Sequence, residues 1–485
     1  MKVLILLIVL SVVSKLTGLF RELSIGFVFG PGEILDTFIV VMMIPSIVLD
    51  VMSSCINSCY VPIHKKYFKS NPIVLMVIFS VCVVISTLFS LFVYFINLEI
   101  LLKFNWNEAV INSEYVLAFS LPASIYVFVC TLNEFFKSIL ACENKSPLIP
   151  VITIFANAVF VLSIYTLSEI IGDSAIAYSY CAFAFTQMLF GLIFTKKYLL
   201  NSSLEQNQKK GNRRKLFIYK FMILIIPVSI GSISNQVNKS VDKYLASSFD
   251  SGSISQLYFS QQLYSVLVGL LIVNIVTFYY PKICESIKDE SKLKKTINES
   301  LYLLTFMSVL ISLIVYHYKY DFVSILMGYG NLKDSLESIT VIFSLYTFGL
   351  AFEAMSAVFK RVMWAGENTV TPVRVSVFGI FLNVILSVYL SSLLGIYGIV
   401  LATVVSNLII CVVLGTIVHK TTTRIIFFKW LISDILVVFP IVYFMSYHIQ
   451  MYDFNKYANL AFAIVTFMLG FGYYLLRRVR FERKI

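Results

Sequence analysis

The hydrophobic positions of this chain fall into long, nearly unbroken runs separated by short polar connections. About 20 apolar residues are needed to cross the hydrocarbon core of a bilayer, and such a span must be helical because lipid offers the backbone no hydrogen-bond partners. The pattern predicts fourteen transmembrane helices. Their approximate limits are 3–29, 34–60, 73–97, 114–140, 148–168, 174–195, 217–247, 254–280, 297–318, 336–359, 373–392, 396–418, 427–448 and 456–476.

Composition supports this interpretation. Of the 485 residues, 59% are hydrophobic and only 13% are charged, whereas a soluble domain has about 25% charged residues. The net charge is +12, but the basic residues lie at the ends of apolar runs, where they orient helices and attract anionic lipid. We therefore expect membrane lipids as partners and no nucleic acid.

The charged residues also predict the orientation of the helices. Lys and Arg are concentrated in alternate connections, including residues 196–215, 282–295 and 477–484, while the connections on the opposite side have an excess of Asp and Glu. Basic connections face the cytoplasm in membrane proteins. Both termini are therefore expected in the cytoplasm.

An internal repeat relates the two halves of the chain. The segment FGPGEILDTF from Phe29 is similar to FDSGSISQLY from Phe249, at a shift of 220 residues. Further matches pair ENKSP from Glu143 with ENTVTP from Glu367, IFANAV from Ile154 with IFLNVI from Ile380, and Gly172 with Gly398. Because the shift covers an even number of predicted helices, the two copies enter the membrane in the same direction.

The repeat predicts an all-α polytopic membrane protein with two six-helix lobes and two additional C-terminal helices. We expect an N-lobe at 1–200, a cytoplasmic linker at 201–215, a C-lobe at 216–420, and the last two helices with a basic tail at 421–485. Paired lobes of this kind bind substrate at mid-membrane and alternate access by rocking. The organisation therefore favours a transporter.

Charged residues inside the predicted spans are candidate binding groups, because each one costs at least about 2.5–3.5 kcal/mol to insert into the bilayer. The first span contains Lys15, Arg21 and Glu22. The last two could instead extend to the membrane surface, since long charged side chains do so near helix ends. Lys15, further from the end, is harder to explain in this way.

The seventh span has the densest polar pattern, with Asn235, Lys239 and either Asp242 or Lys243 expected on one helical face. The structural alternative is that Asp242 only neutralises Lys239 three residues away. In the second span, Asp36 could be a helix cap. Asp50 has no cationic neighbour in the local sequence, so a partner from another span is expected.

The sequence contains no recognisable catalytic motif. HExxH, GxSxG, CxxC and nucleotide-binding loop patterns are all missing. We expect a transporter rather than an enzyme, without a cofactor, driven by an ion gradient, the membrane potential or the substrate gradient.

The N-terminal segment SKLTGLFRELSIGFVFGPGEILDTFIVVMMIPS, from Ser14 to Ser46, resembles the opening of the MviN/MurJ family. Three later segments are also similar to that family: YFSQQLY from Tyr258, GYG from Gly328 and NTVTPV from Asn368. The resemblance extends over most of the chain. It implies membership of the multidrug/oligosaccharidyl-lipid/polysaccharide exporter superfamily, with a location in the bacterial cytoplasmic (inner) membrane.

The resemblance also implies a substrate and a set of binding residues. Members of this family flip lipid II, an undecaprenyl-diphosphate-linked peptidoglycan precursor, and related transporters flip other undecaprenyl-linked glycans. Of three arginines usual in the family's cavity, Arg21 remains, Gln262 replaces another, and the third is replaced near Leu49 and Asp50. The expected substrate-binding residues are Lys15, Arg21, Asp36, Lys239, Lys243 and Gln262. By the same resemblance, Asp242, Asn383 and Thr403 are candidates for coupling to Na⁺ or H⁺.

Our leading hypothesis is a monomeric flippase for an undecaprenyl-diphosphate-linked saccharide, either lipid II or a surface-polysaccharide repeat unit. The first alternative is a cation-coupled multidrug exporter of the same superfamily, which would use carboxylates such as Asp36, Asp50 and Asp242. A membrane glycan polymerase or ligase would need a large outer loop with catalytic Arg or His. An assembly scaffold without transport is the remaining alternative.

Overall fold

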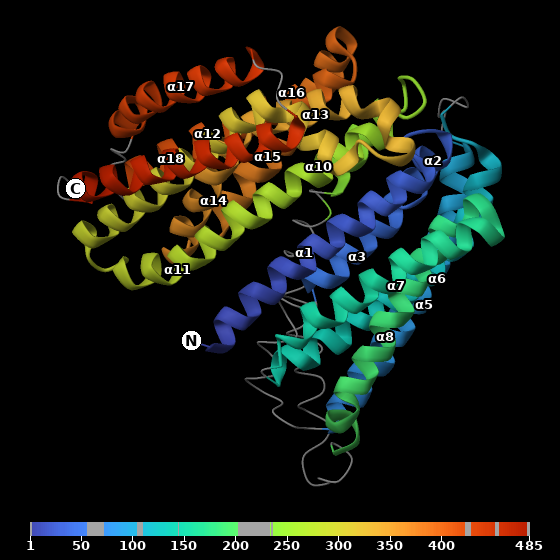
Figure 1. Ribbon diagram of the computed structural model, residues 1–485. Helices are drawn as coiled ribbons and strands as arrows, with labels where there is room; N and C mark the ends of the chain where they lie inside the picture. The colour runs from blue at the N-terminus through green and yellow to red at the C-terminus, as the bar shows by residue number, and fades with distance from the viewer. Residues whose placement is uncertain are drawn as a thin grey trace. The chain divides into compact units, whose positions relative to one another are not determined.

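The computed structural model describes residues 2–55, 72–103, 110–143, 145–201, 233, 236–421, 428–451 and 455–482. Almost all of these residues are helical, and no strand occurs among them (Figure 1). The chain forms two compact units, Met1–Ser255 and Gln256–Ile485, here called unit 1 and unit 2. This confirms the prediction of an all-α fold.

Unit 1 is built around the pairing of long helices. The α6 and α8 helices pack together, α5, α3 and α2 pack on α6, and α7 lies between α1 and α8. The bounds are α1 (Lys2–Phe29), α2 (Glu33–Val41), α3 (Met43–Cys55), α5 (Pro72–Lys103), α6 (Ser113–Cys142), α7 (Leu148–Ile171), the short helix η2 (Gly172–Ser174) and α8 (Ala175–Asn201), followed by a helical segment at 236–246.

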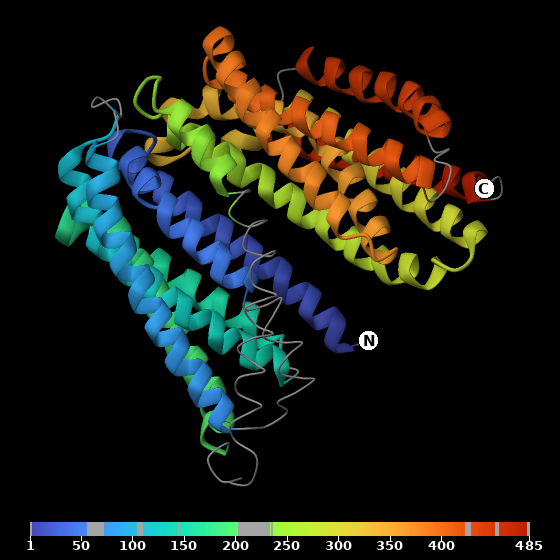
Figure 2. The same ribbon diagram turned by 180° about the vertical axis from the view of Figure 1, so that it is seen from behind.

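Unit 2 is organised around one long helix, α12, which contacts α11, α13, α14, α17 and α18 (Figure 2). The α15 and α16 helices form a hairpin, and α16 also packs on α14. The bounds are α10 (Ser253–Leu267), η3 (Val268–Val273), α11 (Asn274–Ser286), α12 (Glu290–Met327), η4 (Gly330–Ser335), α13 (Leu336–Phe348), α14 (Leu350–Ala365), α15 (Val370–Leu394), α16 (Ile396–Thr421), α17 (Phe428–Met451) and α18 (Lys456–Glu482). The first three residues of α10 belong to unit 1.

The predicted spans agree with the helices over their described parts. Only the range 217–247 falls largely outside the described residues. Nine stretches of the described chain are long and apolar enough to cross a membrane. The total of fourteen spans stays a prediction, and so do the lobe limits, because the linker at 202–215 also lies outside the described residues.

Proline explains the division between α2 and α3. Pro45 has no backbone N–H, so it cannot donate to the carbonyl of Val41 four residues earlier. The buried side chain of Asn97 in α5 takes this place, with its Nδ2 donating to the Val41 carbonyl at 3.3 Å. A broken helix is tolerated inside a membrane only when neighbours satisfy the freed groups in this way.

The repeated segments make similar contacts in the two units. In unit 1 the backbone N–H of Asn112, at the start of α6, donates to Thr37 Oγ1 at 3.1 Å. In unit 2 the Gln256 side chain donates to Ser335 Oγ, at the start of α13, at 3.5 Å. Thr37 and Gln256 both belong to the segments matched at a shift of 220 residues. The segment thus contacts the start of a later helix in both units, through different residues and with the donor and acceptor exchanged.

One of the residue matches was wrong. Gly172 has a φ of 60° and ends α7, and the residue with the same role in unit 2 is Gly395, with a φ of 60°, which ends α15. Gly398, the match expected from sequence, lies inside α16. Positive φ favours glycine, so the turn conformation identifies Gly395 as the counterpart.

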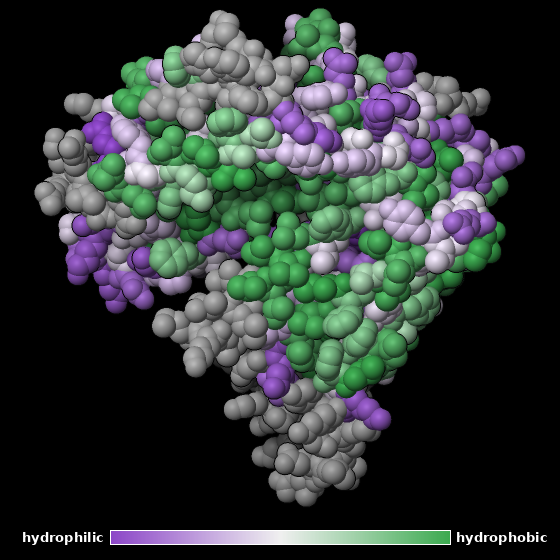
Figure 3. Space-filling view, viewed as in Figure 1, coloured by the Kyte–Doolittle hydropathy of each residue, from purple (hydrophilic) through white to green (hydrophobic). Residues whose placement is uncertain are grey.

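The exterior of the helices is strongly apolar. Large side chains such as Phe20, Leu162, Phe381 and Leu436 are 64%, 68%, 65% and 69% exposed. Figure 3 shows extensive hydrophobic surface on the visible face. Exposed apolar area of this extent is unusual in soluble proteins and suits contact with lipid, which agrees with a membrane protein.

A buried carboxylate connects the last two helices to α12. Asp434 in α17 is fully buried and accepts hydrogen bonds from Tyr302 in α12 and from Tyr473 and Arg477 in α18. The Arg477 Nε lies 2.8 Å from Asp434 Oδ1. Arg477 Nη2 also donates to Ser433 Oγ at 3.3 Å. The Asp434 carboxylate thus joins α17 to α18 through an ion pair and to α12 through a hydrogen bond.

Replacing Asp434 should destabilise unit 2. In an Asp434→Ala variant the Arg477 charge and two tyrosine hydroxyls lose their acceptor, and breaking a buried ion pair costs about 3 kcal/mol. Thermal unfolding of the detergent-solubilised protein would measure the loss. Ser433→Ala is the control, with a cost within about 1 kcal/mol, and equal shifts for both variants would contradict the role given to Asp434.

Candidate functional site

Arg21 lies inside unit 1, enclosed by aromatic rings. Its guanidinium carbon is 4.9 Å from the centroid of the Phe183 ring, 5.4 Å from Tyr180 and 5.6 Å from Phe160. These rings come from α7 and α8, and the Arg21 side chain is 19% exposed. Cation–π contacts of this kind stabilise a cation away from bulk water. Arg21 therefore does not simply extend to the membrane surface.

Glu22 completes this arrangement. Arg21 Nη2 lies 2.5 Å from Glu22 Oε1, and the Glu22 side chain is only 6% exposed. Pairing with a carboxylate makes burial of a guanidinium possible, since an unpaired buried charge would be very costly. Adjacent residues point in different directions on a helix, so the long Arg21 side chain must bend back to make this contact.

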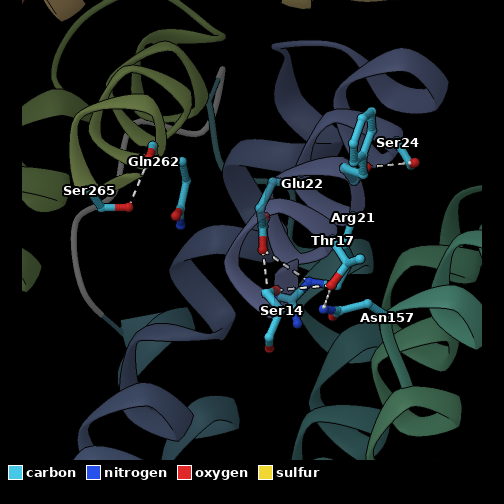
Figure 4. Close-up of polar contacts among 9 residues, drawn as sticks. Ser14, Thr17, Arg21, Glu22, Ser24, Asn157, Gln262 and Ser265 are labelled. Atoms are coloured by element: carbon cyan, nitrogen blue, oxygen red, sulfur yellow. Dashed lines mark hydrogen bonds and ion pairs between the residues drawn. The ribbon is translucent and has the colours of Figure 1, made fainter. Parts of the chain in front are cut away.

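Lys15 lies on the same helix and is half-buried. Near it, Asn157 of α7 donates to Thr17 Oγ1 at 3.0 Å, and Thr17 donates to the Ser14 carbonyl at 2.9 Å (Figure 4). The Asn157–Thr17 hydrogen bond joins α7 to α1 between the two basic residues, while the Thr17–Ser14 bond lies within α1. Lys15 and Arg21 are thereby held on a helix whose rotation about its axis is determined.

Asp36 has a structural partner far along the chain. Its side chain is fully buried, with Oδ2 accepting from the Gly252 N–H at 2.6 Å and Oδ1 from the Ser255 N–H at 2.7 Å. These donors precede and begin α10, where helical N–H groups have no partner within the helix. Asp36 is thus a helix cap, but for another helix than its own. A role in substrate binding stays a prediction.

Asp50 of α3 has the partner in another span that was expected. Gln236 Nε2 donates to Asp50 Oδ2, and the nearby charges are those of Lys239 and Glu134. Glu134 in turn accepts from Lys137 Nζ at 2.8 Å within α6. A polar cluster of mixed charge therefore connects α3, α6 and the 236–246 helix inside unit 1.

The 236–246 helix does not place all its predicted residues in one environment. Lys239 is exposed, Lys243 is half-buried and Asp242 is 6% exposed. Asn235 lies outside the described residues. Spacing predicted a shared polar face, and Lys239 and Lys243 lie one helical turn apart on this helix, while Asp242 is more deeply buried than either.

In unit 2 the structure brings two of the candidate ion-coupling residues together. Asn383 of α15 donates to Thr403 Oγ1 at 3.2 Å and to Ser406 Oγ at 3.1 Å, both on α16. Its amide oxygen accepts from Ser387 at 3.4 Å. The Asn383 amide nitrogen therefore lies toward the hydroxyl groups of Thr403 and Ser406. Asp242, the third candidate, belongs to unit 1.

These groups do not by themselves form a cation site. Hard cations prefer several oxygen ligands, usually including carboxylates, whereas the Asn383 oxygen faces away from Thr403 and Ser406. Among the described residues, no group of three or more His, Cys, Asp or Glu side chains is placed to hold a metal ion.

Gln262 of α10 is the last of the predicted substrate-binding residues. It is half-buried, and its backbone carbonyl accepts a hydrogen bond from the Ser265 hydroxyl at 2.8 Å.

Several charged residues inside the spans were missed. Glu134 and Lys137 form an ion pair in α6, and Glu353 of α14 accepts from Tyr264 Oη at 2.6 Å with Lys360 nearby. Asp434 was also overlooked. The signal was present, because each lies within or at the end of a predicted apolar span, where any charge needs a partner.

The described residues form an apolar helical body with paired charges inside both units, which is the architecture of a polytopic membrane protein. The sequence model of the family described as "Lipid II flippase MurJ" matches residues 25–471, and this chain belongs to that family. It is a transporter rather than an enzyme, and membership implies a multi-pass protein of the bacterial inner membrane with a lipid-linked glycan substrate.

Individual relatives agree with this assignment. A protein of Buchnera aphidicola subsp. Acyrthosiphon pisum named "Probable lipid II flippase MurJ" is 24% identical, covering 95% of this chain and 93% of the relative. An Aquifex aeolicus protein of the same name is 23% identical, with coverages of 81% and 78%.

Solved structures show the same fold. A structure titled "Lipid II flippase MurJ, inward closed conformation" has a TM-score of 0.77 at 21% identity, covering 98% of this chain and 100% of that one. An inward-facing multidrug resistance transporter of the MATE family has a TM-score of 0.67 at 11% identity, with coverages of 87% and 95%. The multidrug transporter therefore fits less well.

Removing the Asp36 carboxylate should loosen the start of α10. In Asp36→Ala the N–H groups of Gly252 and Ser255 lose their acceptor, and loss of a helix cap costs about 1 kcal/mol. Hydrogen exchange followed by mass spectrometry should show faster exchange in peptides covering residues 249–258. Glu33→Ala, in the first turn of α2, serves as control, and unchanged protection in Asp36→Ala would contradict capping.

Proposed function

We propose that this protein flips lipid II across the bacterial inner membrane by alternating access, with both termini in the cytoplasm. The observation that carries the proposal is Arg21, a cation kept inside unit 1 by aromatic rings and Glu22, in a chain matched over residues 25–471 by the lipid II flippase family. A diphosphate headgroup requires such charge-assisted contacts.

Lipid II is the preferred cargo over a surface-polysaccharide repeat unit because the curated relatives are named for lipid II. In this proposal Lys15 and Arg21 on α1, with Lys239 and Lys243 on the 236–246 helix, attract the diphosphate. The protein acts as a monomer and without nucleic acid. Complementation of a strain depleted of its own lipid II flippase tests the cargo directly, and failure to restore growth by a correctly inserted protein would contradict the proposal.

Arg21 should be required for flipping. Arg21→Ala removes the guanidinium while leaving the apolar face of α1 unchanged, so insertion should be normal and lipid II flipping should fall by about 100-fold. A fluorescent or biotinylated lipid II analogue in proteoliposomes would measure the rate. Arg374→Ala, which removes an exposed arginine of α15, is the matched control.

Because Glu22 loses its partner in Arg21→Ala, Arg21→Lys should be measured as well. It keeps the positive charge but loses the planar fork of donors. An intermediate rate is expected at normal thermal stability. Full activity of Arg21→Ala would exclude the proposed role of Arg21.

Asp242 is the proposed coupling carboxylate. Asp242→Asn conserves shape but removes the charge, so flipping should lose at least about tenfold of its stimulation by a sodium gradient or of its sensitivity to protonophores. Asp250→Asn, at an exposed aspartate, is the control. If the ion response of Asp242→Asn equals that of the unmodified protein, Asp242 is not the coupling group.

A further inference from the structure

Glu353 lies inside an apolar stretch of unit 2 without a basic side chain in contact with it. It is near the start of α14, within the stretch Gly330–Ala365, and its side chain is half-buried. Its Oε2 accepts a hydrogen bond from the Tyr264 hydroxyl of α10 at 2.6 Å. Among the described residues, none of the ion pairs includes Glu353. Because a charge inside a bilayer is costly without a partner, a hydroxyl in place of a cation is informative.

Other carboxylates inside the units have a different kind of partner. Glu22, Glu134 and Asp434 each contact a basic side chain at 2.5–2.8 Å. Such a contact keeps a carboxylate ionised, because protonation would leave the cation unpaired in a medium of low dielectric constant. The neutral Tyr264 hydroxyl can donate to a carboxylate oxygen and also to the carbonyl oxygen of a protonated carboxyl group. The hydrogen bond from Tyr264 to Glu353 is therefore compatible with both protonation states.

The packing of Tyr264 fixes this hydrogen bond in place. Tyr264 is buried, and its ring stacks on that of Tyr346 in α13, with centroids 5.5 Å apart and an interplanar angle of 24°. Its hydroxyl is thereby held against Glu353 Oε2. The other oxygen of Glu353, Oε1, accepts no hydrogen bond from a described residue. Oε1 is thus the atom at which a proton can bind without breaking an existing contact.

Few titratable groups lie near Glu353. The α14 helix packs against α11, α12, α13, α15, α16 and η3, but within the described part of the chain only Tyr264 and Lys360 interact electrostatically with Glu353, and α13 contributes Tyr346 through its contact with Tyr264. Lys360 follows Glu353 by seven residues on the same face of α14, which separates the two backbone positions by about 10 Å along the helix axis. It offsets the carboxylate charge at a distance without occupying Oε1.

We propose that Glu353 is a proton-binding site of unit 2. In this proposal Oε1 takes up a proton from water, while Oε2 accepts the Tyr264 hydrogen bond before and after uptake. Release returns the proton to water and restores the carboxylate. Uptake leaves the Lys360 charge without its carboxylate, so the surroundings of α14 attract an anion more strongly in the protonated state. The site is separate from Asp242, which belongs to unit 1, and it does not depend on the proposed function.

Infrared spectroscopy can observe the proton directly. The carbonyl stretching band of a protonated carboxyl group should appear when the protein, reconstituted in liposomes, is taken from alkaline to acidic buffer. Isotopic labelling of glutamate separates this band from those of aspartate, and partial burial should place it at a higher frequency than bands of water-exposed glutamic acid. Glu353→Gln should lose the band. Its amide oxygen can still accept from Tyr264, so the variant should remain folded.

Tyr264→Phe provides a second test in which the carboxyl group is retained. The phenylalanine ring can still stack on Tyr346, but the hydrogen bond to Glu353 Oε2 is lost. The band should therefore persist and move to higher frequency, because its carbonyl oxygen no longer accepts from a hydroxyl group. A role of Glu353 in packing alone would not produce this shift, and the test remains decisive if Glu353→Gln does not fold.

Glu337→Gln is the matched control. It removes an exposed glutamate from the first turn of α13 and should keep the band. The proposal is wrong if the spectra of the unmodified protein and Glu353→Gln agree at every pH at which both are folded, because Glu353 then stays ionised. A Glu353 band of constant intensity, or one that does not shift in Tyr264→Phe, would also overturn it. None of these measurements requires flipping, so their outcome is independent of the flippase proposal.

Discussion

An ionised side chain inside a bilayer must find a partner within the protein, and this requirement accounts for much of the described structure. Arg21 pairs with Glu22, Lys137 with Glu134, and Arg477 with Asp434. In lipid the alternative to pairing is a cost of several kcal/mol for each charge. The first two pairs lie within α1 and α6, whereas Asp434 joins α17 to α18 through Arg477 and to α12 through Tyr302.

The same requirement applies to the backbone. Pro45 frees the Val41 carbonyl and Asn97 satisfies it. The first N–H groups of α10 need an acceptor, and Asp36 provides it. Outside the spans water can take this role, yet Asp289 still caps α12, where hydrogen bonds from Ser291 and Lys292 lower the pKa of the Asp289 carboxyl to about 2. Helix ends are thus specified by single polar residues.

Helix positions could be predicted well because hydropathy is a local property that the bilayer translates directly into helical spans. Partners could not. Asp36 and Gly252 are separated by more than two hundred positions. The repeat matches their segments in sequence, but a sequence match does not show that two segments are in contact. Helical spacing predicts the common face of Lys239 with Asp242 or Lys243. It does not predict that Asp242 is buried and Lys239 exposed, because burial depends on neighbours that spacing does not reveal.

The repeat conserves backbone features more closely than charge. Gly172 and Gly395 end equivalent helices with the same positive φ, and Asn157 and Asn383 occupy equivalent positions. Their partners nevertheless differ: Asn157 connects α7 to α1, whereas Asn383 connects α15 to α16. Asp36 is matched by uncharged Gln256, and Arg21 has aromatic neighbours in unit 1 while unit 2 buries a Glu353–Tyr264 pair.

This divergence has a consequence for transport. The two units contain different charged groups: unit 1 holds the Arg21–Glu22 and Lys137–Glu134 pairs, and unit 2 holds Glu353 and the Arg477–Asp434 pair. Since a ligand shifts a conformational equilibrium only through its differential interaction with the two states, these charged groups matter for transport where their contacts with the cargo differ between states. The repeat thus gives the two units a common helical plan, and their different charged groups give them different chemistry.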